Sequence, residues 1–283
     1  MKRVKEFSYI KLPENPPKYL KWAFRKAGKN VYQVRGAGKI YDYEVLPRWG
    51  WEVIYEMLKK LYNIKGFGGF DGVKDEIKGE FLRLYGEFVE NVRGYTMKEN
   101  KRGVGKIMLE RYKVYKVFEI PAKKHSLGLP EEVLYLNYIL HLLGFKADEY
   151  MKVQPEFFKV KYLNDSENKK LWLLAYLISI GVFGYGYSGF LINTPLLFEE
   201  FVGEVYKGKR YKGDKLIRPD YVLGNNTPLD AKYKTKVQRS DVYQAFTYAK
   251  VLGVNRAILV YPKIKPKVIT LGDVSVFVEG VFS

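Results

Sequence analysis

The stretch LIRPDYVLGNNTPLDAKYK, residues 216–234, decides how the C-terminal part of the chain folds. Its apolar runs predict two strands, at 216–223 and 228–234. The Gly/Asn-rich sequence between them, GNNT at 224–227, is typical of a hairpin turn. Pro219 favours an edge or bulge position for the first strand, because proline cannot donate a ladder hydrogen bond. We therefore predict a β-hairpin at this point.

Helices and buried strands are predicted on both sides of the hairpin. Polar residues followed by proline, NTP at 193–195, predict the start of a helix that continues through LLFEEFVGEVY. Ser240 is predicted to cap a second helix that ends at Gly253. Apolar runs at 257–261 and 274–282 predict two further strands. The order helix, hairpin, helix, strand, strand indicates an α/β layer arrangement.

Two aspartates and a lysine should meet on the hairpin. Residues i and i+2 of a strand face the same side, so Asp230 and Lys232 should point together and Ala231 away from them. Asp220, near the end of the first strand, can approach Asp230 across the hairpin. Two close carboxylates repel each other unless a cation neutralises them, and a divalent metal would do so and also polarise a phosphate. Lys232 can orient or help deprotonate an attacking water and stabilise charge on the phosphoryl group.

The composition limits which metal such a site could take. The chain has no cysteine and only two histidines, His125 and His141, which excludes thiolate sites and disfavours both a multi-histidine zinc centre and a histidine-based triad. The ligands would have to be oxygens, and the backbone carbonyl of Ala231 can supply one more. Oxygen ligands favour Mg²⁺ or Mn²⁺.

The charge of the chain favours a polyanionic partner. Lys and Arg number 49 against 31 Asp and Glu, which gives a net charge of +18. Nucleic acid is the first candidate and an anionic membrane the second, while a generally lysine-rich surface is the alternative explanation. Basic residues are dense on both sides of the predicted site. We expect seven of them to contact a nucleic-acid backbone: Lys209, Arg210, Lys212, Arg218, Lys234, Lys236 and Arg239.

Three motifs in this order resemble a known family of nucleases. RPDYVL at 218–223, LDAKYK at 229–234 and DVYQAFTYA at 241–249 resemble the PD-(D/E)xK nuclease superfamily with its associated Q-x-x-x-Y helix. Within that superfamily they are similar to McrC, the nuclease subunit of modification-dependent McrBC restriction systems. LLFEEFV at 196–202 resembles the family's phenylalanine-glutamate helix. The resemblance implies a restriction-endonuclease-like mixed sheet flanked by helices, and it covers about residues 196–262.

The resemblance also implies roles for individual residues. It assigns metal binding to two aspartates, one backbone carbonyl and one helical glutamate: Asp220, Asp230, Ala231 and Glu199. Glu200 is the alternative helical ligand. Lys232 is the implied catalytic lysine, and Gln244 lies near the site among the catalytic residues. Tyr248 supports the site, although packing in the core explains this tyrosine equally well.

The implied activity is that of an Mg²⁺- or Mn²⁺-dependent endodeoxyribonuclease subunit. It would dock on a hexameric AAA+ partner, McrB, and stimulate GTP hydrolysis by that partner. The chain has no nucleotide-binding motif of its own, so motor activity would come from the partner. Three alternatives stay open: a stand-alone PD-(D/E)xK nuclease of DNA repair or of RNA- or CRISPR-associated defence, a nucleic-acid-binding protein with a decayed site, and a membrane-associated basic protein.

The chain is expected to form two domains. Residues 1–165 are predicted as an N-terminal α+β domain that docks the partner, and residues 166–283 as the nuclease domain. The N-terminal part shows strand character at 31–45 and 108–120 and helical patterns at 51–62, 73–92 and 131–143.

One uncharged run raises the question of a membrane. Residues 171–192 are long enough to cross a bilayer, but Gly, Tyr and Ser in the second half favour a buried helix at about 169–180 followed by a turn. The first seventeen residues have no apolar core, so no signal peptide is predicted. We therefore expect a cytoplasmic protein that does not enter a membrane.

Overall fold

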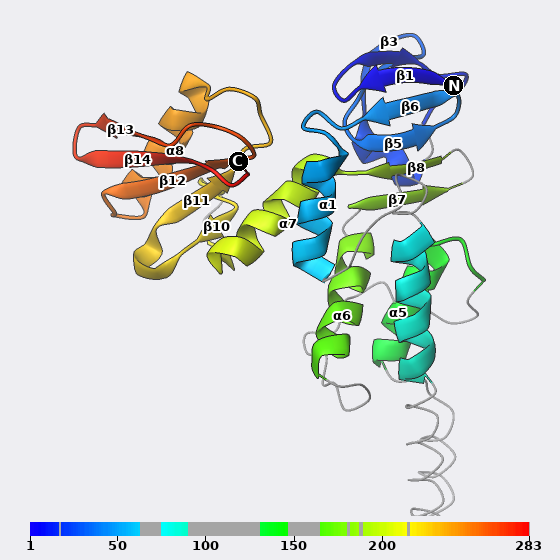
Figure 1. The fold of residues 1–283 in the computed structure, drawn as a ribbon. Coiled ribbons are helices and arrows are strands. Elements are labelled where there is room, and N and C mark those ends of the chain that lie inside the picture. Colours follow the sequence, from blue (N-terminus) through cyan, green and yellow to red (C-terminus); the bar gives the residue numbers. More distant parts are fainter. Residues whose placement is uncertain are drawn as a thin grey trace, which may run out of the picture. The chain divides into compact units, whose positions relative to one another are not determined.

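The structure is a computed structural model that describes residues 1–16, 18–62, 75–89, 131–146, 165–179, 182–186, 189–213 and 216–282 (Figure 1). The chain divides into two compact units, Met1–Phe70 together with Gly181–Ser283, and Asp71–Ile180. The first unit crosses the boundary predicted at residue 165. The reason is that strand β5 (Ala37–Ile40) pairs antiparallel with β8 (Gly189–Ile192), which joins strands from both ends of the chain in one sheet.

The C-terminal sheet has six strands in the order β13-β14-β12-β11-β10-β9. Strands β11, β12 and β14 are parallel, whereas β9, β10 and β13 join antiparallel. The class is therefore mixed α/β, as predicted. The bounds are β9 (Lys209–Arg210), β10 (Tyr221–Val222), β11 (Pro228–Ala231), β12 (Arg256–Tyr261), β13 (Lys267–Leu271) and β14 (Val274–Gly280). Strand β13, an edge strand with exposed residues, was not predicted.

The predicted hairpin is present, with Tyr221 opposite Leu229, but its strands are shorter than expected. The first comprises only β10, because Pro219 has no N–H to donate to a ladder. A short 3-10 helix, η3 (Gly224–Asn226), makes the turn, with Asn225 and Asn226 in left-handed conformations that asparagine tolerates. These features leave Asp220 directly before β10, where its side chain can turn toward β11.

Two helices border the hairpin. Helix α7 (Thr194–Tyr206) begins as predicted, with Asn193 as its cap and a proline in the first turn. Helix α8 (Arg239–Val251) begins two residues earlier than a cap at Ser240 predicts. Ser240 is therefore not the cap; Gln238 occupies that position, and its side chain makes no capping hydrogen bond to the helix. The end of α8 at Gly253 is confirmed, because this glycine has a positive φ of 69°.

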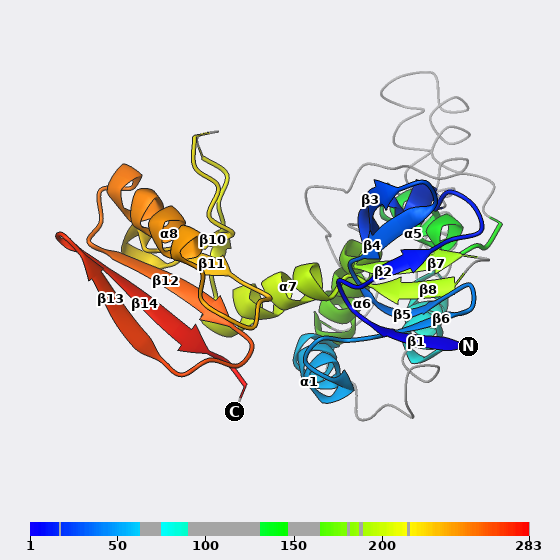
Figure 2. The same cartoon turned by 90° about the horizontal axis from the view of Figure 1, so that it is seen from above.

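The core of this sheet lies between α8 and the parallel strands. Val242, Ala245 and Ala249 of α8 are buried in one cluster with residues of β12 and β14, Leu259 and Val276 among them. Figures 1 and 2 show α8 running along one face of these strands. Burying this apolar face fixes α8 on the sheet, so polar side chains near the start of the helix can be aimed at the end of β11.

The remaining sheets of the first unit have the strand orders β1-β6-β5-β8-β7 and β2-β4-β3. The bounds are β1 (Lys2–Lys5), β2 (Tyr9–Lys11), β3 (Phe24–Gly28), β4 (Val31–Val34), β6 (Tyr43–Leu46) and β7 (Phe183–Gly186), with a 3-10 helix η1 (Lys18–Ala23) and helix α1 (Trp51–Tyr62). Strand character at 31–45 and the helix at 51–62 are confirmed. The glycine-rich segment predicted as a turn after residue 180 instead supplies the paired strands β7 and β8.

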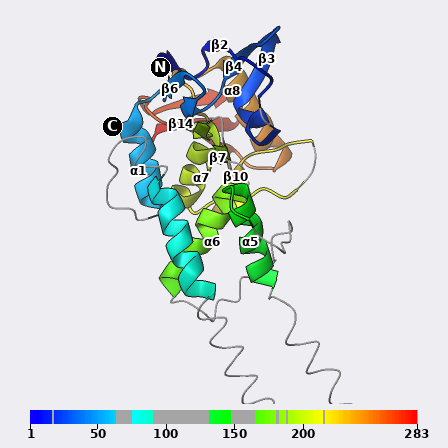
Figure 3. The ribbon, with the colours of Figure 1, turned by 90° about the vertical axis from the view of Figure 1, so that its right-hand side faces the viewer.

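The second unit is helical where it is described. It comprises a helix at 75–89, α5 (Glu131–Leu142) and α6 (Asp165–Ser179). Helices α5 and α6 lie side by side (Figures 1 and 3). The predicted strand at 108–120 lies outside the described residues. Helix α6 ends at Ser179, and among the described residues no helix is long and apolar enough to span a bilayer.

Candidate active site

The structure brings together the three residues that the hairpin was expected to join. Ala231 donates its backbone N–H to Asp220 Oδ2 at 2.8 Å, which ties the residue before β10 to β11. Asp230, on β11, is only 3% exposed. The ammonium group of Lys232 forms an ion pair with Asp230 Oδ2. Two carboxylates and one ammonium group therefore meet at the carboxyl end of β11.

Backbone groups of β11 favour a cation at this place. Lys232 donates its N–H to Val260 O at 2.7 Å, on the β12 side, whereas the Ala231 N–H points toward Asp220. The N–H and C=O of one strand residue point to the same side, so the Ala231 carbonyl also lies on the Asp220 side. Asp230 Oδ2 is buried, and the cation that faces it is the ammonium group of Lys232. Two carboxylates and a carbonyl make an oxygen donor set that fits Mg²⁺ or Mn²⁺.

The protonation of the site reflects its burial. Burial raises the pKa of Asp220 to about 8, the negative charges of Asp230 and Glu199 act in the same direction, and the hydrogen bond from Ala231 opposes them. For Lys232, burial alone would lower the pKa, but Asp230 and Asp220 outweigh it and raise the pKa. Lys232 is thus a charged ammonium group next to the carboxylate of Asp230.

A chain of hydrogen bonds holds the lysine in place. Lys232 Nζ donates to Gln244 Oε1 at 2.9 Å, and Gln244 Nε2 donates to the Tyr248 hydroxyl at 2.6 Å. The Tyr248 hydroxyl donates to the carbonyl of Arg218 at 3.1 Å, two residues before Asp220. Gln244 and Tyr248 are one turn apart on α8, so both can face the sheet. Tyr248 is buried, yet its hydroxyl connects the lysine to the strand that carries Asp220.

The helical glutamate is near the aspartates but bound elsewhere. Glu199 accepts a hydrogen bond from Arg210 Nη1 at 3.1 Å, and Arg210 Nη2 pairs with Glu200. Among the described residues, no three Asp, Glu, His or Cys side chains form a group that could hold a metal ion. Burial raises the pKa of Glu199, Arg210 lowers it and Asp230 raises it, so the charges of these groups act on one another. The expected fourth ligand is therefore not in a ligand position in this state.

The seven basic residues expected at a nucleic-acid backbone differ in their surroundings. Lys234 already binds two side chains of the protein, because its ammonium group lies 2.7 Å from Asp241 Oδ1 and 2.8 Å from Gln238 Oε1. Arg210 is exposed but engaged with the two glutamates. The other five have exposed side chains: Lys209, Lys212, Arg218, Lys236 and Arg239.

Two buried polar groups near the site were missed from the sequence. Asp241, in the first turn of α8, is 3% exposed and accepts hydrogen bonds from Lys234 and from the Tyr261 hydroxyl at 3.0 Å. Glu6, after β1, is 4% exposed; it accepts the backbone N–H of Arg48 at 2.7 Å and the hydroxyl of Thr194. Because Thr194 begins α7, Glu6 anchors the helix that carries Glu199. The start of the DVYQ motif could have pointed to Asp241; no sequence signal pointed to Glu6.

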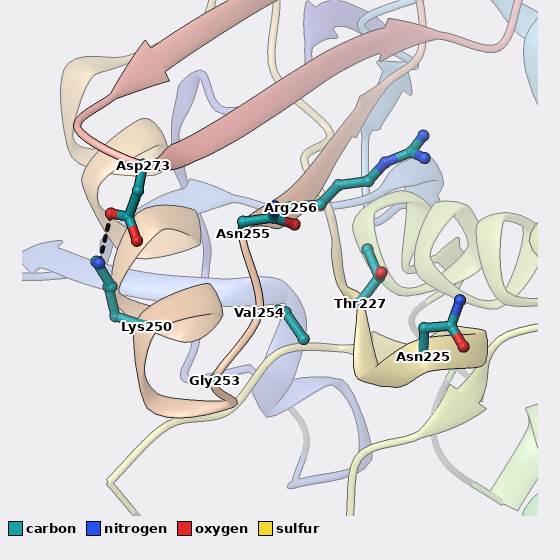
Figure 4. A pocket seen from close by; sticks show the side chains of 8 residues that line it. All are labelled: Asn225, Thr227, Lys250, Gly253, Val254, Asn255, Arg256 and Asp273. Carbon is teal, nitrogen blue, oxygen red and sulfur yellow. Dashed lines mark hydrogen bonds and ion pairs between the residues drawn. The ribbon is translucent and has the colours of Figure 1, made fainter.

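The hollow drawn in Figure 4, of about 720 Å³, contains none of the predicted site residues. Thr227, which precedes β11, and Arg256, which begins β12, line it, so it lies at the amino ends of these strands. Its carboxylate, Asp273, is paired with Lys250. The predicted site residues Asp220, Asp230 and Lys232 lie at the opposite, carboxyl end of β11.

Asp220→Asn should change how stability depends on pH in the metal-free protein. The folded pKa of about 8 exceeds the ordinary value of 3.8, so between these values the folded state binds more protons and wild-type stability falls as pH rises. The variant lacks this contribution. Its stability relative to wild type should therefore rise between pH 4 and pH 8, by roughly 1.4 kcal/mol per unit of pKa difference. Urea unfolding with EDTA at pH 5 and pH 8 measures this; an unchanged difference between the proteins would contradict it.

Comparisons with known proteins give no match: no family model, curated protein or solved structure resembles the chain significantly. A functional proposal therefore depends on two sources only. The first is the geometry around Asp220, Asp230 and Lys232, and the second is the motif pattern of the sequence.

Proposed function

We propose that the chain is an Mg²⁺- or Mn²⁺-dependent endodeoxyribonuclease that hydrolyses phosphodiester bonds at the end of β11. The single observation that carries the proposal is the bond from the Ala231 N–H to Asp220 Oδ2. It places Asp220 beside buried Asp230, whose neighbour in space is the ammonium group of Lys232. Two carboxylates this close repel each other unless a proton or a cation neutralises one of them, and a charged lysine next to them suits an anionic substrate.

The residues of the site have separate roles in the proposed reaction. A divalent metal, when bound, supplies a Lewis acid for the phosphate and lowers the pKa of a water molecule. Asp220, Asp230 and the Ala231 carbonyl would hold it. Lys232 stabilises negative charge on the phosphoryl oxygens, and Gln244 keeps the ammonium group oriented through its 2.9 Å hydrogen bond.

Three features support a restriction-endonuclease-like fold and an McrC-type role. Helix α7, the β10–β11 hairpin, α8 and β12 follow one another in the order of the nuclease motifs, with β11 and β12 parallel. The exposed basic residues suit DNA. The motif text favours a subunit that docks on an McrB-like AAA+ GTPase hexamer in a modification-dependent restriction system, with the N-terminal part as the docking region.

Cleavage assays test the activity and its context separately. Purified chain is incubated with methylated and unmethylated plasmid DNA and Mg²⁺, with and without a GTPase partner, and with EDTA as a control. We expect Mg²⁺-dependent cleavage that requires methylated DNA, GTP and the partner. Cleavage of plain DNA by the chain alone would favour the stand-alone nuclease. Cleavage that persists in EDTA and in an Asp230→Asn variant would refute the proposed activity.

Gln244→Ala should lower the cleavage rate about 10- to 100-fold, because an unanchored ammonium group is not held toward the phosphate. Tyr248→Phe should cause a smaller loss in the same direction, since only the far end of the hydrogen-bond chain is removed. Tyr243→Phe is the matched control: this tyrosine lies on the same helix but is exposed, and its hydroxyl contacts Arg239. Equal rates for Gln244→Ala and Tyr243→Phe under single-turnover conditions would refute this role of Gln244.

A further inference from the structure

Arg210 connects the edge of the C-terminal sheet to helix α7. It lies on β9, opposite Tyr221 of β10, and its guanidinium group lies 5.4 Å from the centroid of the Tyr221 ring. The ring of Tyr221 also touches α7, because a Cβ on Gly203 would come within 2.5 Å of the tyrosine hydroxyl. Edge strand and helix are therefore close, and the residue next to Tyr221 is the predicted ligand Asp220.

Arg210 forms an ion pair with Glu199, the carboxylate that is missing from the predicted metal site. Arg210 binds Glu199 at 3.1 Å and also pairs with the following residue, Glu200. Glu199 is nonetheless close to the end of β11, because the ring of Phe198, the residue before it, lies 5.8 Å from the ring of Tyr233, the residue after Lys232. Release of Glu199 from Arg210 would leave a third carboxylate on α7 able to turn toward Asp220 and Asp230.

The guanidinium group is accessible to a substrate. The Arg210 side chain is 39% exposed, against 23% for Glu199 and 10% for Glu200. Lys209 beside it and Lys212 after it are exposed as well, so an approaching polyanion would meet three cationic side chains on this segment. Arginine binds phosphate in a bidentate manner, which makes a DNA phosphate a strong competitor for the two glutamates.

We propose that Arg210 makes metal binding depend on DNA: it holds Glu199 in the free protein and transfers to a DNA phosphate on binding, which frees Glu199 to complete the metal site. This inference rests on the proposed nuclease function. Because coupling between two ligands is reciprocal, DNA should increase metal affinity and metal should increase DNA affinity. The metal site with all three carboxylates then forms only when DNA is bound.

The test measures binding of Mn²⁺ by electron paramagnetic resonance of the free ion, without reference to activity. Full-length wild type, Arg210→Ala and Lys209→Ala are titrated alone and with a phosphorothioate DNA duplex that resists hydrolysis, with the duplex alone as blank. We expect Arg210→Ala to bind Mn²⁺ roughly five- to tenfold more tightly than wild type without DNA. We also expect the duplex to increase wild-type affinity by a similar factor and to add little to that of Arg210→Ala.

Matched variants separate a specific effect from a general charge effect. Lys209→Ala removes the same charge from the neighbouring position, so an equal gain in this variant would overturn the proposal. Adding Glu199→Gln to Arg210→Ala should abolish the gain, whereas adding Glu200→Gln should keep it; the reverse pattern would overturn the role of Glu199. If wild type binds no Mn²⁺ with or without the duplex, or if Asp220→Asn binds Mn²⁺ as tightly as wild type does, the proposed metal site itself fails. If Asp220→Asn loses binding but Arg210→Ala equals wild type, only the Arg210 inference fails.

Discussion

Asp230→Asn is expected to reduce DNA cleavage by about a thousandfold or more, with the fold retained. Asp230 is buried at the end of β11 and contacts the ammonium group of Lys232. The amide keeps the shape of the side chain but removes the charge that a divalent cation requires. Removal of a group that stabilises the transition state directly typically costs 10²–10³ in rate, and loss of a metal ligand should reach or exceed the upper part of this range.

The measurement is the single-turnover rate of plasmid cleavage in Mg²⁺ and in Mn²⁺. Asp273→Asn is a suitable control, because Asp273 is an exposed aspartate in the turn between β13 and β14, where it pairs with Lys250. It should cleave at the wild-type rate. If Asp230→Asn retains a tenth or more of the wild-type rate while unfolding at the same urea concentration, the assignment of Asp230 is wrong.

Phe198→Ala is expected to lower the free energy of unfolding by about 3–5 kcal/mol. The ring of Phe198 is fully buried, with its centroid 5.8 Å from that of Tyr233 and 6.5 Å from that of Phe201. Phe198 precedes Glu199 and Tyr233 follows Lys232, so this contact fixes α7 against the segment that leaves β11. The variant should therefore also bind Mn²⁺ more weakly than wild type.

Chemical denaturation of Phe198→Ala and Phe198→Leu tests the packing. Leucine keeps most of the apolar volume, so its loss should be about 1–1.5 kcal/mol. A loss below about 1 kcal/mol for Phe198→Ala would mean that α7 does not depend on this contact. A large loss of stability with unchanged Mn²⁺ affinity would show that the helix position matters little for the metal site.

The sequence predicted the clustering of Asp220, Asp230 and Lys232 better than the strands that carry them. The i, i+2 spacing of Asp230 and Lys232 and the turn at 224–227 follow from local rules of strand geometry and turn chemistry, and the structure agrees with both. The i, i+4 spacing of Gln244 and Tyr248 likewise placed both side chains on one face of α8. Strand length was overestimated, because a proline and non-local hydrogen bonds decide where a ladder ends.

What the sequence did not predict depends on contacts between distant residues. The pairing of β5 with β8 joins segments about 150 residues apart, and no local pattern encodes such a partner. Glu6 is a lone acidic residue in a basic N-terminal segment, and only the fold places it against Thr194. The engagement of Glu199 with Arg210 is of the same kind: spacing predicted the carboxylate but not the cation that holds it.

The central claim is that Asp220, Asp230 and the Ala231 carbonyl form one cation site at the end of β11. Crystals of the full chain soaked in MnCl₂ would test it through anomalous diffraction from manganese. We expect a peak bounded by oxygens of these three residues, at roughly the 2.0–2.2 Å expected for a small octahedral divalent cation. No peak between the two aspartates, or a manganese ion bound only elsewhere on the chain, would contradict it.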